Sequence, residues 1–218
     1  MSRPAAGRVD GEKKSLIASE RDEAARVAWR AMAALWDARR VVFVDESGTQ
    51  TNMTPRTSRA PRGQRAVGAA PRNHGKNTTL IAALSADGMG AAMTLEGAAD
   101  ADAFVAYLRH FLVPTLTPGQ VVVMDNLSVH KDERVAPLIA EAKCRLVYLP
   151  AYSPDFTPIE QAFSKLKTFL RRAEARTREA LEEAITTALT TITPTDAAGW
   201  FTACGYLLET DQSLCDPL

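Results

Sequence analysis

The chain has 218 residues, of which 46% are hydrophobic and 24% charged, so it is long enough for one domain with a substantial core and has an ordinary globular composition. Its first residues are polar and no apolar run reaches membrane-spanning length, so we expect neither a secretory signal nor a membrane partner. The three cysteines lack metal-ligand spacing and favour a reducing, cytoplasmic setting.

The hydrophobic pattern predicts strands and helices in an order typical of an α/β fold. The predicted elements are a helix at 19–37, strands at 41–45, 78–86 and 89–96, a helix at 100–112, a strand at 121–125, a helix near 132–142, a strand at 145–149, and helices that begin at 158 and 177. Asp87-Gly88 is a strong turn dipeptide between the second and third strands. Three early strands, a crossover helix and two more strands predict a five-stranded mixed sheet flanked by helices.

Local signals at the helix ends refine these boundaries. Ser19 with Asp22 resembles a capping box, and the helix that follows should bury an apolar side that includes Val27 and Leu35. The last helix is amphipathic, and Pro194 is expected to end it.

Two apolar strands each end in a carboxylate, Asp45 and Asp125, and Glu160 follows Asp125 with 34 residues between them. Acids gathered at the carboxyl edge of a sheet could hold two divalent cations for phosphoryl transfer on nucleic acid. The alternative is three unrelated surface acids. For Glu160 the competing role is local, because Thr157 and Glu160 have the spacing of a capping box. Its helical neighbours Lys167 and Arg171, however, suit a helix face that contacts DNA.

Basic residues are concentrated in one segment. Residues 47–86 contain no Asp or Glu and carry six of the 26 basic residues, so the remainder holds 20 basic against 26 acidic residues. The candidate DNA-binding residues of this segment are Arg56, Arg59, Arg62, Arg65, Arg72, His74 and Lys76. Because Pro and Gly surround them, they cannot form a core but can contact phosphates, which predicts a polyanion partner. A solvated loop without a partner is the alternative.

Three motifs resemble the DDE transposases of the mariner superfamily, with the closest likeness to the bacterial insertion-sequence branch. They are Val44-Asp45-Glu46, the stretch MDNLSVHK at 124–131, and the stretch LPAYSPDFTPIE at 149–160. The resemblance covers residues 40–206. It implies an RNase H-like fold, two Mg²⁺ or Mn²⁺ ions, and cut-and-paste transposition, typically into TA dinucleotides.

The resemblance also implies roles for residues. Asp45, Asp125 and Glu160 take the places of the family's catalytic, metal-binding acids. Residues 47–77 take the place of a clamp loop that contacts transposon ends and the partner subunit of a homodimer on DNA. Just past the second aspartate, Asn126, His130 and Lys131 are expected to orient water or phosphate, with a surface-loop residue as the alternative for His130.

The expected domain organisation is a tail and linker helix at 1–39, a catalytic domain at 40–206 and a tail at 207–218. Family members carry helix-turn-helix modules before the catalytic domain. Only about 40 residues precede the first strand here, so the chain resembles the catalytic half alone.

Three other functions compete with a transposase. The stretch DESGT at 45–49 resembles the nucleophile loop of a haloacid-dehalogenase-type phosphatase, but no later lysine and acid pair fits. Ser128 and His130 suggest a hydrolase, yet no Gly-x-Ser-x-Gly elbow is present. The third is an inactive transposase remnant that only binds DNA or a partner, against which the intact acids argue.

Overall fold

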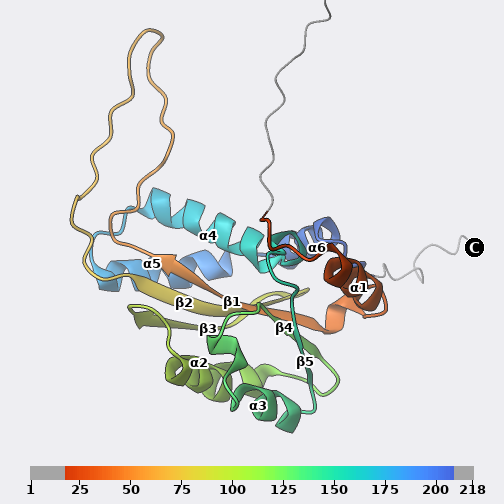
Figure 1. Cartoon of the computed structure of the whole chain (residues 1–218). Helices are drawn as coiled ribbons and strands as arrows, with labels where there is room; N and C mark the ends of the chain where they lie inside the picture. The colour runs from red at the N-terminus through yellow and green to blue at the C-terminus, as the bar shows by residue number, and fades with distance from the viewer. Residues whose placement is uncertain (1–17, 209–218) are drawn as a thin grey trace, which may run out of the picture.

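The computed structural model describes residues 18–208, whose centre is a five-stranded sheet in the order β3-β2-β1-β4-β5 (Figure 1). The strands are β1 (Val41–Thr49), β2 (Thr78–Ser85), β3 (Gly88–Glu96), β4 (Val121–Met124) and β5 (Arg145–Tyr148). The first three pair antiparallel, whereas β4 and β5 run parallel to β1. This arrangement confirms the predicted mixed sheet.

Helices cover both faces of the sheet. They are α1 (Glu23–Ala33), α2 (Ala101–Tyr107), α3 (Val135–Glu141), α4 (Ile159–Ala173), α5 (Arg178–Thr190) and α6 (Pro194–Ala203). Figure 1 shows α4, α5 and α6 above the sheet and α2 and α3 below it. Between residues 18 and 208, no helix is long and apolar enough to cross a membrane.

The alternation of side chains along β1 divides the core into two layers. Val41 and Phe43 belong to the hydrophobic cluster under α4, α5 and α6, whereas Val42 and Val44 belong to the cluster under α2 and α3. Successive side chains of a strand point to opposite faces, so an apolar run without polar interruptions is what a strand covered on both sides requires.

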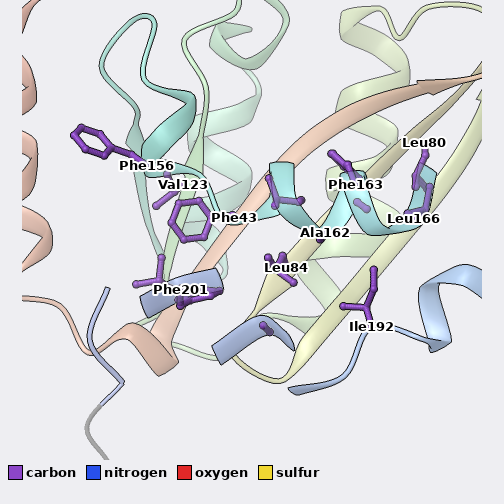
Figure 2. Close-up of a cluster of buried hydrophobic side chains, with 14 of the residues drawn as sticks. Phe43, Leu80, Leu84, Val123, Phe156, Ala162, Phe163, Leu166, Ile192 and Phe201 are labelled. Atoms are coloured by element: carbon purple, nitrogen blue, oxygen red, sulfur yellow. The ribbon is translucent and has the colours of Figure 1, made fainter. Parts of the chain in front are cut away.

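Helix α4 is anchored in the first cluster by its apolar stripe. Figure 2 shows Phe163 and Leu166 of α4 with Phe43 of β1, and Phe201 of α6 lies in the same cluster. Phe43 and Phe201 meet edge to face, with ring centroids 5.5 Å apart. Burial of these large side chains fixes the start of α4 relative to the end of β1, which places Glu160 beside the sheet edge.

The first helix differs from its prediction in extent and in the face it buries. Its N-cap is Asp22, which accepts a hydrogen bond from the backbone N–H of Ala25. Val27 and Leu35 are 68% and 86% exposed, so their predicted burial is wrong, whereas Met32 and Trp36, predicted on the same apolar side, do pack against the core. The buried residues of α1 are Arg26 and Trp29. The helix docks through an ion pair of Arg26 and through Trp29, whose ring N–H donates to the Tyr206 hydroxyl.

A further helix was not predicted, because Pro194 does not end the amphipathic pattern but begins α6. Thr193 and Asp196 form a capping box at its start, with each side chain accepting from the other's backbone N–H. Proline is favoured at the first position of a helix, since the missing N–H would have no intrahelical partner there. The predicted helix at 100–112 is α2 followed by a π-helical turn at Leu108–Leu112.

Candidate active site

A cleft of about 400 Å³ lies at the carboxyl end of β4 and beside the middle of β1, and all three predicted acids line it. Its walls are parts of these strands, the segment 149–154 and the start of α4 with Thr157 and Glu160. The parallel register pairs Val44 with Met124, so the residues that follow them, Asp45 and Asp125, lie at the same level. The predicted convergence of the acids is therefore a feature of the fold. The predicted end of the first strand at Asp45 is wrong, because β1 continues to Thr49 in its pairing with β2.

Asp45 lies in an environment that disfavours its charged form. Burial and the negative charges of Asp125 and Glu160 raise the pKa of Asp45 to about 7, although the N–H of Glu46 donates to its carboxylate and opposes the shift. A carboxyl group that responds to two others must lie near both of them. The site thus concentrates negative charge in a partly dry cleft, which favours a bound cation.

Glu160 lies in the first turn of α4 and is exposed to the cleft. Pro158 takes the N-cap position, and no side chain caps this helix. The capping box expected from Thr157 and Glu160 is therefore wrong. Within the described residues the Glu160 carboxylate has no hydrogen bond or ion pair, and it shares the cleft with the other two acids.

His130 is fully buried, so the surface-loop alternative for this residue is wrong. Its Nδ1 lies 2.5 Å from Oδ1 of Asp125, and its Nε2 lies 3.3 Å from Oε1 of Glu46. Burial alone would lower the pKa of His130, but the hydrogen bonds to Asp125 and Glu46 outweigh it and raise the pKa to about 9. Both ring nitrogens then donate, and the bond from His130 helps keep the pKa of Asp125 below its usual range despite burial.

Sequence reasoning did not identify Glu46 as a site residue. It follows Asp45 on β1, and its side chain, 17% exposed, points to the opposite face and reaches His130. Strand alternation was the available signal, because neighbours in a strand must face opposite ways. Of the other two residues expected to orient water or phosphate, Asn126 lines the cleft, whereas Lys131 is exposed and does not line it.

The oxygen-only donor set of Asp45, Asp125 and Glu160 suits a hard divalent cation such as Mg²⁺. Within residues 18–208, however, no three His, Cys, Asp or Glu side chains are grouped closely enough to hold one ion together. The residues fit the metal by their chemistry and by their shared cleft.

The segment between β1 and β2 extends away from the body as a long loop (Figure 1). The arginines of this segment, Arg56, Arg59, Arg62, Arg65 and Arg72, are all exposed. Lys76 instead forms an ion pair of 2.7 Å with Glu96, and His74 is half-buried, with its carbonyl accepting from the Thr51 hydroxyl.

Arg171 connects this loop to the basic face of α4. Its pKa is lowered by partial burial and by the nearby positive charge of Arg56. Lys167, one turn closer to Glu160, is half-buried on the same helix. Cations held close to one another repel, so the start of the loop and α4 together form a positive surface that an anion would stabilise.

Comparison with solved structures identifies the same fold in Mos1. The Mos1 strand transfer complex has a TM-score of 0.67 at 17% identity, covering 93% of this chain and 64% of that chain. The mariner Mos1 paired end complex with Mg has a TM-score of 0.68 at 17% identity, covering 94% of this chain and 65% of that chain. The catalytic domain of Mos1 mariner transposase gives 0.57 at 14%, covering 86% of each chain. These likenesses confirm the RNase H-like fold, and the chain spans about two thirds of the Mos1 polypeptide in the complexes.

The sequence itself matches a known family over most of its length. No curated protein matches the chain. The family model described as DDE superfamily endonuclease matches residues 40–182, a range that contains the whole sheet and all three acids of the cleft. The chain therefore belongs to the DDE superfamily endonucleases.

Proposed function

We propose that this chain is the catalytic part of a mariner-type transposase that cuts DNA strands and joins them to a target. The observation that carries the proposal is the meeting of Asp45, Asp125 and Glu160 in one cleft, in a member of the DDE superfamily endonucleases. Transposition, rather than cleavage alone, is supported by the fold shared with Mos1, which has been solved as a strand transfer complex and as paired end complexes.

The three acids are assigned as catalytic ligands of two Mg²⁺ or Mn²⁺ ions. Such ions, when bound, lower the pKa of an attacking water or 3′-hydroxyl and stabilise the charge on the leaving oxygen. The assignment is supported by the oxygen donors of the cleft and by the mariner Mos1 complexes solved with Mg and with Mn.

The three acids of the cleft have different roles. Asp125 stays ionised near neutral pH, since its pKa is held low. Asp45, with a pKa of about 7, carries a proton on its carboxylate part of the time and so limits repulsion among the three acids. Glu160 is exposed at the start of α4 and has no competing bond within the described residues, so it is free to turn towards a phosphate-bound cation.

The DNA strands would pass between the cleft and the basic loop. Arg56 and Arg171 form the near end of this path, with Lys167 between Arg171 and Glu160 along α4. The remaining loop arginines would follow the phosphates further out, whereas Lys76 contributes less because Glu96 already pairs with it. We also propose that the chain binds transposon ends, joins them to a TA target and acts as a homodimer on DNA. Its proposed source is a bacterial insertion sequence.

A nicking assay tests this function directly. The whole chain is incubated with supercoiled plasmid and Mn²⁺, and wild type should convert plasmid to the open-circular form. Asp125→Asn should reduce nicking to background while the far-ultraviolet circular dichroism stays unchanged. Asp102→Asn, an exposed acid outside the cleft, is the matched control and should nick like wild type. Nicking by Asp125→Asn at the wild-type rate would contradict the assignment.

The second candidate is an inactive remnant that binds DNA without cutting it. The spread of the acids is the observation in its favour, because no three of the described ligating side chains are grouped tightly enough to hold one ion. Wild-type protein that binds duplex DNA but never nicks it, with either Mg²⁺ or Mn²⁺, would support the remnant and overturn the enzyme.

A further inference from the structure

The side chain of His130 has no contact with solvent, yet both of its ring nitrogens face carboxylates. A buried histidine that only fills space needs one partner, often a backbone carbonyl, to satisfy its ring N–H. Here one partner is Asp125 at the end of β4 and the other is Glu46 on β1. The ring therefore links β1 and β4, the two strands that place Asp45 and Asp125 in the cleft.

Two further contacts and a short turn hold this residue in place. Its plane packs against Phe104 of α2, with 4.4 Å between the centroids. The carbonyl of His130 accepts a hydrogen bond of 2.7 Å from the Tyr148 hydroxyl on β5. The residue itself lies in the short 3₁₀ turn Val129–Lys131 that follows the second aspartate. Neither water nor phosphate can reach a ring so enclosed, so His130 cannot orient either of them as the sequence suggested.

The bonds to Asp125 all fall on one of its two oxygens. Oδ1 accepts from the backbone N–H of Leu127 at 3.0 Å and from His130 Nδ1. No described residue bonds Oδ2. A carboxylate with one oxygen occupied by two donors has a fixed plane, and its other oxygen remains available to the cleft that Asp125 lines.

Glu46 completes the arrangement from the opposite face of the sheet. Asp45 points into the cleft beside Glu160, whereas Glu46, the next residue, holds Nε2 of His130 on the α2 side. Because its side chain is mostly buried, this bond is protected from competing water. The adjacent acids of β1 thus have different roles, because Asp45 faces the cleft and Glu46 faces the His130 ring that holds Asp125.

We propose that Glu46 and His130 are positioning residues, in which Glu46 orients the His130 ring and the ring fixes the carboxylate of Asp125 with one oxygen turned towards the cleft. This inference rests on the proposed function, since it explains how that site presents its second acid. Neither residue touches the substrate.

The test measures Mn²⁺ binding to the whole chain without DNA, by titration calorimetry. His130→Phe keeps the packing on Phe104 but removes both donors, and Mn²⁺ affinity should fall about 10–100-fold, as for other supports of metal ligands. His130→Asn retains a donor near the position of Nδ1 and should recover most of the affinity. Glu46→Gln, which keeps the shape and an acceptor oxygen, should lose less than His130→Phe. His110→Phe, at an exposed position, is the matched control and should bind like wild type.

Metal-free protein provides a second readout. The ring N–H protons of His130 should exchange slowly in nuclear magnetic resonance spectra of wild type, and Asp125→Asn should shift the Nδ1 signal. If His130→Phe fails to fold, the affinities of His130→Asn and Glu46→Gln are read together with the exchange rate of the ring protons, since glutamine conserves the volume of glutamate and asparagine is smaller than histidine. Unchanged Mn²⁺ affinity in folded His130→Phe, or in both conservative variants together with a fast-exchanging ring proton, would overturn the inference. Should Asp125→Asn abolish nicking in that case, the proposed function would stand and only the positioning role would fall.

Discussion

Arg26 and Asp155 lie 129 residues apart in the chain and form a two-pronged ion pair, with Nη1–Oδ1 at 3.0 Å and Nη2–Oδ2 at 2.6 Å. Arg26 is only 2% exposed, and its guanidinium stacks 4.1 Å from the ring centroid of Phe156. Asp155 belongs to the 3₁₀ turn Pro154–Phe156, which joins the wall of the cleft to α4. Helix α1 therefore holds the segment that leads into Glu160.

Removal of Asp155 should destabilise the protein by leaving a buried cation without its partner. For Asp155→Asn we expect a loss of about 2 kcal/mol in the free energy of unfolding, less than for a fully buried pair because Asp155 is half-exposed. Urea denaturation measures it. Arg30→Met is the control, since Arg30 is 68% exposed and lies 3.8 Å from the same carboxylate.

The same pair makes stability depend on pH. The hydrogen bond from Arg26 lowers the pKa of Asp155, so the stabilisation is present above the ordinary carboxyl pKa of about 4 and is lost as the pH falls through the lowered value. The stability difference between wild type and Asp155→Asn should therefore shrink on acidification. A difference that stays constant down to about pH 2 would show that the charge of Asp155 is not responsible.

Asp45→Asn should stabilise the metal-free protein near neutral pH. The pKa of Asp45 is raised to about 7, so the native state prefers the protonated carboxyl and loses stability as the pH rises from about 4 to 7. An amide cannot ionise, so the gain should be on the order of 2 kcal/mol near pH 8 and vanish near pH 4. Melting temperatures in the presence of a chelator test this, and an equal gain at both pH values would contradict it.

Several elements were predictable because one strong local signal decided each of them. The apolar runs before Asp45 and Asp125 have no polar interruption, and Asp87-Gly88 forces a turn, so the strands and their order followed. Two parallel neighbours in register bring the residues after their apolar runs to the same level, so the position of Asp45 beside Asp125 was predictable.

The interactions that the sequence left undetermined depend on partners far along the chain. Arg26 is buried and Val27 exposed, because α1 turns towards the core the face that carries Arg26, Trp29 and Met32, and Arg26 finds its partner there in Asp155. Glu46 and His130 are 84 positions apart. Their contact depends on how the 3₁₀ turn Val129–Lys131 packs against β1, which the sequence does not specify. The start of α6, in contrast, has a local signal in the sequence, because Thr193 and Asp196 have the spacing of a capping box. It was missed because Pro194 was expected to end a helix and not to begin one.

Divalent cations should raise the melting temperature by binding the native state. At a free cation concentration about 100 times Kd, the free energy of unfolding rises by about 2.7 kcal/mol. Asp45→Ala and Glu160→Ala should each lose most of the Mn²⁺-induced increment, which differential scanning fluorimetry measures. Glu179→Ala is the matched control, because Glu179 occupies the first turn of α5 as Glu160 does that of α4. Equal increments in all variants would place the metal elsewhere.

Tyr152 combines a left-handed backbone with an exposed ring at the cleft. Its φ is 55°, and 56% of its surface is exposed. Asparagine tolerates this conformation better than alanine, so Tyr152→Asn should be more stable than Tyr152→Ala by about 1 kcal/mol. If the ring stacks on a base of DNA in the cleft, both variants should lose about 1–3 kcal/mol of affinity for single-stranded DNA, and Tyr152→Phe should lose little. Fluorescence anisotropy measures this, and wild-type affinity in Tyr152→Ala would exclude stacking.

The basic loop provides the last prediction, which concerns the salt dependence of DNA binding. The variant under test changes four loop arginines to alanine, namely Arg56, Arg59, Arg62 and Arg65. All four are exposed on a loop that extends away from the body (Figure 1), so their replacement should leave the fold intact. Each phosphate contact releases counterions, and the slope of log affinity against log salt concentration should flatten by up to about four times 0.9.

The quadruple variant should weaken binding to every duplex alike, because contacts to phosphate carry no base information. Its matched control removes the same charge from exposed positions outside the cleft and the loop, at Arg40, Arg109, Lys143 and Arg145. Arg40 and Arg145 lie at the amino ends of β1 and β5, the edge of the sheet opposite the acids. The control should change the slope far less if DNA lies across the carboxyl edge and the loop. Equal flattening in both variants would mean that DNA binding depends only on the net charge of the protein. A slope changed by the control alone would place DNA on the opposite edge of the sheet.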